Sequence, residues 1–196
     1  MLVLGGVSLT TAPAALAAGC TITDGPSLQA AVDGGGTVTL CQNITYTSPD
    51  SPGLTIPAGK TVTLDLAGFT LDLTGAARWA GIQTVDATLI INGPGTLKAT
   101  GGDGIPDSSG GGSGIGGSDS GSLCDGGTLT INAVTTVEAT GGLGNVDHGG
   151  GSGIGGCGAH NGGGAGGTVT INGSTVTATG GVGGGLGGGV GGGGLG

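Results

Sequence analysis

Apolar and polar residues alternate in several short segments of this chain. In residues 61–66 (TVTLDL) the apolar side chains fall at every second position, and residues 128–131 and 168–171 behave in the same way. Successive side chains of a β-strand point to opposite faces, so these segments predict strands with one face in a core and the other in solvent.

The strand-like segments recur as a three-part unit. Asn92, Asn132 and Asn172 each end one apolar run and are 40 residues apart. A second strand-like run follows each asparagine, then Gly-Gly, and GSGIGG occurs at 112–117 and 151–156. A fixed period of this length is the signature of a solenoid.

Extending the unit backwards predicts three ladders of inward-facing residues, which indicates an all-β, three-sided β-solenoid. Glycine-rich loops such as 101–111 absorb the extra length of the later coils. The predicted ladders are Leu40, Leu64, Ile91, Ile131 and Ile171; Tyr46, Leu71, Leu97, Val137 and Val176; and Leu54, Ile82, Ile115 and Ile154.

Both ends of such a solenoid are expected to be covered, because an open end exposes apolar core and unpaired strand edges. Residues 27–32 (SLQAAV) predict a short capping helix with Ser27 as its N-cap. Residues 182–196 predict a glycine-rich tail, either disordered or cut from a larger parent chain. The glycine-rich loops after Gly101 are expected to add no buried area, while glycine loses much backbone freedom on ordering. The coils after Gly101 are therefore expected to be less stable.

The first 17 residues predict a signal peptide. An apolar stretch ends at Ala15-Leu16-Ala17, which matches an A-x-A cleavage site, although no Lys or Arg precedes it. A buried first strand is the alternative. Export makes the chain secreted or cell-surface, with a β-helix domain over 18–181, and no other stretch is apolar for long enough to span a membrane.

Four cysteines in an exported chain favour disulfides. Positions relative to the predicted coils pair Cys20 with Cys41 and Cys124 with Cys157. Two alternatives stay open. The cysteines could bind a metal with His148 and His160, or Cys20 could carry a lipid anchor.

Composition narrows the function classes. Glycine supplies 55 of 196 residues without a Gly-X-Y period, which excludes collagen. Hydrophobic residues are 35% and aromatic ones 2%, so the core must be built from small aliphatic side chains. The net charge is −9 with only three basic residues, which excludes nucleic acid as a partner.

The segments GTVTL and GLTIPAGKTVTLDLAGFTLDLTG resemble the opening coils of bacterial right-handed parallel β-helix proteins. The GSGIGG and GGTVTINGSTVTATGG units resemble glycine-rich repeats of bacterial, especially actinobacterial, secreted and surface proteins. The resemblance covers residues 20–181. It implies the right-handed parallel β-helix of the pectate-lyase-like group, several members of which bind or cleave polysaccharides.

The catalytic residues of that group do not carry over to this sequence. Its lyases use a calcium site with a catalytic arginine, whereas Arg78 has no acidic triplet near it. Its hydrolases use clustered aspartates, whereas Asp65 and Asp72 lack an Asp-Asp or His companion. No catalytic residue is therefore assigned, and an acid–base pair at Asp65 and Asp72 remains the enzymatic alternative.

Three kinds of binding site remain as candidates. Trp79, Tyr46 and Arg78 are the candidates for carbohydrate contact, since aromatic platforms stack on sugars. Asp107 and Asp147, 40 residues apart, and Asp103 are candidates for calcium, the alternative being solvated loop carboxylates.

The third candidate is an array of Thr-x-Thr segments that could bind ice or another flat surface. Ile90 interrupts this array, and threonine is also an ordinary outward residue of strands.

The sequence as a whole favours a non-catalytic extracellular module with a structural or adhesive role. A polysaccharide-binding protein is the first alternative, and a polysaccharide lyase or hydrolase is the second.

Overall fold

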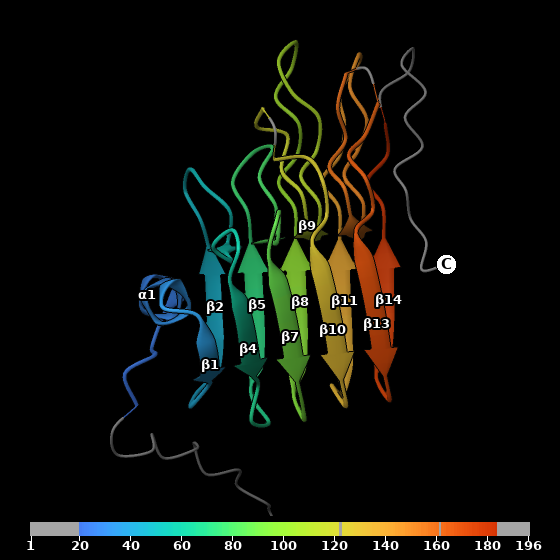
Figure 1. Ribbon diagram of the computed structural model, residues 1–196. Helices are drawn as coiled ribbons and strands as arrows, with labels where there is room; N and C mark the ends of the chain where they lie inside the picture. Colours follow the sequence, from blue (N-terminus) through green and yellow to red (C-terminus); the bar gives the residue numbers. More distant parts are fainter. Residues whose placement is uncertain (1–19, 122, 161, 184–196) are drawn as a thin grey trace, which may run out of the picture.

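The alternating segments form strands that pair with the equivalent strands of the next coil, always in parallel. The computed structural model describes residues 20–121, 123–160 and 162–183, and within them the coils stack into a right-handed, three-sided parallel β-helix (Figure 1). The predicted signal peptide and residues 184–196 of the predicted tail lie outside the described residues. None of the helices in the described ranges is long and apolar enough to cross a bilayer.

Each complete coil contributes one strand to each of three sheets. The first sheet contains β1 (Gly36–Thr39), β4 (Thr61–Asp65), β7 (Thr88–Asn92), β10 (Thr128–Asn132) and β13 (Thr168–Asn172). The second contains β2 (Ile44–Thr47), β5 (Thr70–Thr74), β8 (Thr96–Thr100), β11 (Thr136–Thr140) and β14 (Thr175–Thr179). The third contains β3 (Leu54–Thr55), β6 (Ile82–Gln83), β9 (Ile115–Gly116) and β12 (Ile154–Gly155).

The third predicted ladder, Leu54 to Ile154, is confirmed by the register of the third sheet. The first two ladders are wrong only in the first coil. Leu64 stacks on Val38 rather than on Leu40, and Leu71 stacks on Ile44 rather than on Tyr46.

The ring of Tyr46 explains the shift in the second sheet. Tyr46 pairs with Leu73 in register, and its ring lies against Gly25, where a β-carbon would overlap it. The aromatic side chain therefore fills the space between the first coil and the cap. Hydropathy alone did not separate this residue from its neighbour Ile44.

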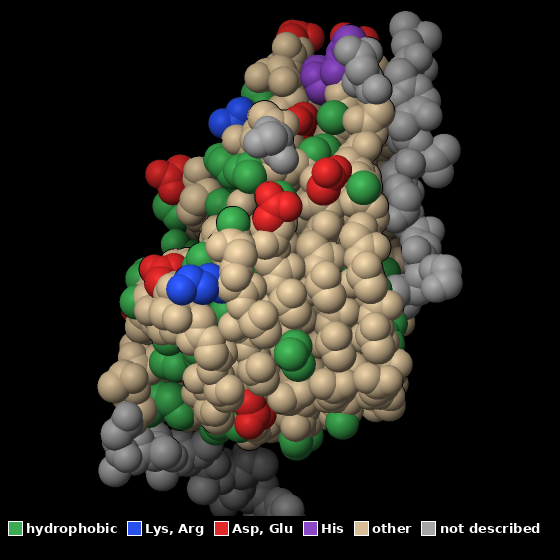
Figure 2. Space-filling view, in the orientation of Figure 1, with side chains coloured by type: hydrophobic (Ala, Val, Ile, Leu, Met, Phe, Trp, Pro, Cys, Tyr) green, Lys and Arg blue, Asp and Glu red, His purple; other side chains and the backbone are tan. Residues whose placement is uncertain are grey.

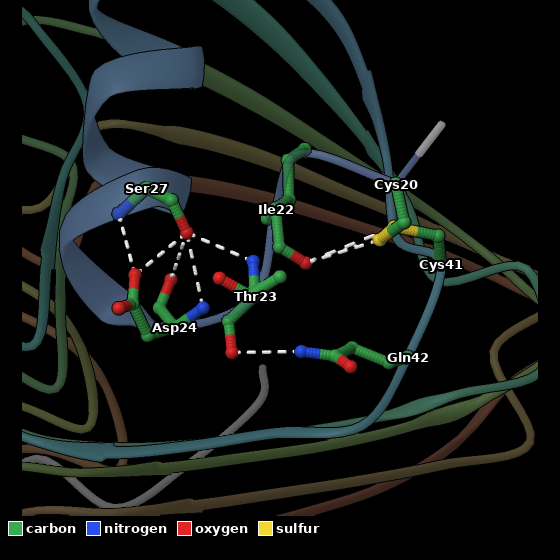
Figure 3. Close-up of a disulfide and its surroundings, with 7 residues drawn as sticks. All are labelled: Cys20, Ile22, Thr23, Asp24, Ser27, Cys41 and Gln42. Carbon is green, nitrogen blue, oxygen red and sulfur yellow. Dashed lines mark hydrogen bonds between the residues drawn. A yellow bond between two sulfur atoms is a disulfide. The ribbon is translucent and has the colours of Figure 1, made fainter. Parts of the chain in front are cut away.

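The predicted cap is helix α1 (Gly25–Asp33), which buries Leu28 and Val32 against the first coil. The predicted N-cap is wrong: Asp24 holds that position, and its carboxylate accepts a hydrogen bond from the backbone N–H of Ser27 (Figure 3). The Ser27 hydroxyl in turn accepts from the Asp24 backbone N–H at 3.0 Å. This reciprocal capping box satisfies amides that the first turn leaves unpaired.

Both predicted disulfides, Cys20–Cys41 and Cys124–Cys157, are confirmed. The first ties the segment before α1 to the turn that follows β1, as Figure 3 shows. Residues 21–23 form no strand, but Ile22 is buried and the Gln42 amide donates to the carbonyl of Thr23 at 2.7 Å. Side-chain contacts thus fix this segment without a sheet.

The largest departure from the sequence prediction concerns the glycine-rich segments 101–114 and 141–153, which we call the glycine layer. They leave the second sheet and return to the third as paired arms beyond the ends of the strands (Figure 1). Residues 109–118 and 148–158 are buried, so the prediction of loops that bury no area is wrong.

Backbone hydrogen bonds connect arm to arm across the glycine layer at 2.8–2.9 Å. They run in sequence from the amide of Gly181 to Gly151, Gly142, Gly112, Gly102 and finally the carbonyl of Trp79. A β-carbon on Gly142 would overlap the carbonyl of Gly102, and one on Gly151 would overlap that of Gly112. Glycine is required because the arms approach each other backbone to backbone, which is a packing requirement that hydrophobic periodicity does not report.

Candidate functional site

The carbohydrate candidates lie in two different places. Arg78 and Trp79 occupy the connection between β5 and β6, and the guanidinium carbon of Arg78 lies 5.4 Å from the centre of the Trp79 ring. Both side chains are half-buried. Tyr46 packs against the cap instead, so the structure does not make it part of a surface platform with Trp79.

The connection that holds Arg78 and Trp79 is anchored to the glycine layer. Arg78 has a positive φ of 67°, its N–H donates to the carbonyl of Asp103 at 2.8 Å, and its carbonyl accepts from Asp119 at 3.0 Å. The carbonyl of Trp79 accepts from Gly102. The stacked cation and indole are thus presented on a fixed backbone.

The calcium candidates differ in what their carboxylates do. Asp103 is used internally, since Oδ1 accepts from the backbone N–H of Leu143 at 2.8 Å. Asp107 and Asp147 are exposed, each in the turn that joins the two arms of its own glycine segment, 101–114 and 141–153 respectively. The described ranges contain no group of three or more His, Cys, Asp or Glu side chains placed to hold a metal ion.

Asp119 and Asp125, two further aspartates of the glycine-rich loops, also join glycine segments. Asp125 Oδ1 accepts from the N–H of Ala165 at 2.7 Å, and Asp119 Oδ2 accepts from the N–H of Gly110. Like Asp103 and Leu143, Asp125 and Ala165 are 40 residues apart. In both pairs the accepting aspartate lies one repeat before the donating residue, and that residue stands between two glycines in the sequence.

His148 and His160 lie together at the end of the glycine layer, where Figure 2 shows both histidines as one purple group. Their ring centres are 5.1 Å apart, and the buried His148 has Nδ1 3.0 Å from Asn145 Oδ1. The Asn145 amide donates to the carbonyls of Ile105 and Ser109, so its oxygen faces the ring. His148 therefore carries hydrogen on Nδ1, which leaves Nε2 as the acceptor when the ring is neutral.

The structure places the two carboxylates of the enzymatic alternative, Asp65 and Asp72, on different sheets. Asp65 lies on the first sheet and Asp72 on the second, so the two carboxylates project from different faces of the same coil. Asp65 Oδ1 accepts from the N–H of Ala67 at 2.9 Å. Paired acid and base groups must flank one bond, and these two residues do not share a face.

The outward face of the first sheet is a regular surface of short side chains. Its short side chains form columns because equivalent residues of successive coils are in register. The columns are Thr61, Thr88, Thr128 and Thr168; Thr37, Thr63, Ile90, Thr130 and Thr170; and Thr39, Asp65, Asn92, Asn132 and Asn172. Figure 2 looks onto this face, which is broad and almost entirely tan, the colour of backbone and uncharged polar side chains.

Hydrogen bonds order the asparagine column. Asn132 Nδ2 donates to Asn92 Oδ1 at 3.0 Å, and Asn172 Nδ2 donates to Asn132 Oδ1 at 2.8 Å. Each amide is therefore fixed by the coil before it. The repeated asparagines found in the sequence align the edge of the face from coil to coil.

The strands of the second sheet pair in the same parallel register, but the middle column of its outward face has different side chains. Two threonine columns flank a middle column that contains charged residues. The middle column is Thr45, Asp72, Lys98, Glu138 and Thr177. Lys98 Nζ lies 3.0 Å from Glu138 Oε2, and that hydrogen bond raises the pKa of Lys98.

The stacked ladders, the capped first coil and the two regular faces define a disulfide-containing, right-handed parallel β-helix protein. Comparisons with protein-family models, curated proteins and solved structures found no significant match.

Proposed function

We propose that this chain is a non-catalytic, extracellular or cell-surface β-helix module with a structural or adhesive role. The observation that supports it most is the outward face of the first sheet, where five coils present short, uncharged side chains in register, with Asp65 as the one charged position. Such a face offers many equivalent weak contacts rather than one concave site. Ligand and active sites are normally concave and bury most of a small ligand.

The interior and the disulfides support the same proposal. Inward positions are filled by aliphatic side chains, and a hollow beside β9 and β12, lined by Ile115, Leu129 and Ile154, has no room for a water molecule. Disulfides persist in oxidising compartments, which favours export. A rigid, filled rod suits mechanical or contact roles.

Polysaccharide binding is the second candidate, and the Arg78–Trp79 pair is the observation that favours it. An indole backed by a guanidinium on an anchored backbone offers an apolar ring face and hydrogen-bond donors together. In this proposal Trp79 contacts the sugar and Arg78 orients its ring. Tyr46 takes no part because it supports the cap.

The purified protein should be incubated with a glycan array and with pectin, with and without calcium. We expect no release of oligosaccharides in either condition, and released products would overturn the non-catalytic proposal. Retention of a glycan that Trp79→Ala abolishes, with Phe69→Ala as the aromatic control, would select the polysaccharide-binding candidate. Retention that depends on calcium and is lost in Asp107→Asn or Asp147→Asn would assign these carboxylates to the metal.

A further inference from the structure

The outward face of the first sheet is a two-dimensional lattice. Neighbouring strands of a sheet lie about 4.8 Å apart, and alternate residues of a strand are about 6.7 Å apart. Two adjacent columns fill this lattice almost entirely with threonine, from Thr61 to Thr168 and from Thr37 to Thr170. Each threonine adds one hydroxyl and one methyl group at a repeating position.

The lattice is held rigidly. Threonine is β-branched, which restricts its χ1 rotamers. The strands beneath are tied to both neighbours, and the inward residues Leu64, Leu89 and Ile131 of the same strands are fully or almost fully buried. The face is therefore ordered before any ligand arrives, which lowers the entropic cost of binding.

Single contacts on this face are weak. None of its column positions is aromatic, and a lone hydroxyl or methyl group contributes little free energy in water. Strong binding requires a ligand that meets many of these groups at the same time. That ligand must itself be rigid and periodic, with a repeat near that of the strands.

We propose that the threonine columns of the first sheet bind ice. The oxygen positions of hexagonal ice repeat at spacings close to those of the lattice, so the hydroxyls can take the places of water molecules while the methyl groups sit in the hollows between them. Ile90 interrupts the hydroxyls of one column but keeps a β-branched apolar group of similar height. This inference rests on the proposed adhesive role and names its surface and substrate.

The second sheet provides an internal comparison. Its threonine columns are as regular, but Asp72, Lys98 and Glu138 stand between them. Charged side chains are longer, hold their own hydration and exceed the height of the threonines. The same strand spacing on that face therefore does not offer a continuous hydroxyl and methyl surface.

The test uses the full chain with its disulfides intact. Ice-affinity partitioning and thermal hysteresis are measured for the wild type, for Thr130→Tyr on the first sheet and for Thr140→Tyr on the second sheet of the same coil. We expect the wild type to be enriched in ice, Thr130→Tyr to lose about tenfold or more of that enrichment, and Thr140→Tyr to keep it. Thr63→Tyr replaces Thr130→Tyr if the latter fails to fold, as judged by circular dichroism.

The outcomes separate this inference from the proposed function. A wild type that stays in the liquid, or equal losses in Thr130→Tyr and Thr140→Tyr, overturns ice binding. Retention on crystalline cellulose or chitin without enrichment in ice also overturns it, while leaving the adhesive role in place. Release of soluble sugars from those polymers would instead overturn the proposed function itself.

Discussion

The backbone N–H of Gly151 donates to the carbonyl oxygen of Gly142 at 2.9 Å, although the two residues lie on opposite arms of one excursion from the solenoid. The outgoing arm of this excursion is therefore hydrogen-bonded to its returning arm, and both are hydrogen-bonded to glycine segments of adjacent coils. The glycine layer behaves as a second packed body attached to the sheets, and this changes which parts of the chain are expected to resist unfolding.

Amide hydrogen exchange should reveal this layer directly. We expect the amides of Gly112, Gly142 and Gly151 to exchange as slowly as those of Leu129 and Ile131 in β10, because all five donate inside buried, hydrogen-bonded structure. The exposed turns around Asp107 and Asp147 serve as the fast-exchanging control. Fast exchange of the three glycines would contradict the packed layer.

Substitution of one packed glycine should destabilise the protein more than substitution of an open one. Gly142→Ala places a β-carbon on the carbonyl of Gly102, so the arms must separate, at a cost of about 1–3 kcal/mol. Gly166→Ala is the matched control, because a β-carbon there meets nothing within 4 Å. Urea unfolding measures both, and equal free energies of unfolding would argue against backbone-to-backbone packing.

Truncating a core residue at the centre of the solenoid should lower the free energy of unfolding more than truncating one in the last coil. Leu64 is fully buried between two coils, so Leu64→Ala should cost about 2–5 kcal/mol. Ile171 is only half-buried on β13, and Ile171→Ala should cost less and release mainly the last described coil. Denaturant titration gives the total free energy, and exchange at Thr175–Thr179 reports the local effect.

Acid should weaken the cap through Asp24. Hydrogen bonds from the Ser27 hydroxyl and the Ser27 N–H lower the pKa of Asp24 below 3.8, its unfolded value. The resulting stabilisation is present above that value and is lost as the pH falls through the lower folded pKa. Asp24→Asn keeps a good N-cap without the charge.

The free energies of unfolding of the wild type and Asp24→Asn should therefore converge as the pH falls below 3.8. Asp33→Asn, at the other end of α1, is the control for a general charge effect. A difference between wild type and Asp24→Asn that stays constant from neutral pH to strong acid would rule out this linkage.

The sequence by itself determined the strands, the three-sided coil, the capping element and the disulfide pairs, because each depends on a local or strictly periodic signal. Alternation places Leu64 inside whatever its neighbours are, and the 40-residue repeat brings Asn92, Asn132 and Asn172 into one column. In the less regular first coil, the register depended on how Tyr46 meets Gly25.

Only the tertiary structure decided the state of the glycine segments and the character of the two faces. A glycine run has no side-chain pattern, so its sequence does not reveal whether a carbonyl from another coil, such as that of Gly102 against Gly142, lies within contact. Likewise, the sequence shows Asp72, Lys98 and Glu138 as separate charges. Their placement in one column, away from the threonines of the first sheet, depends on which strands the coil brings side by side.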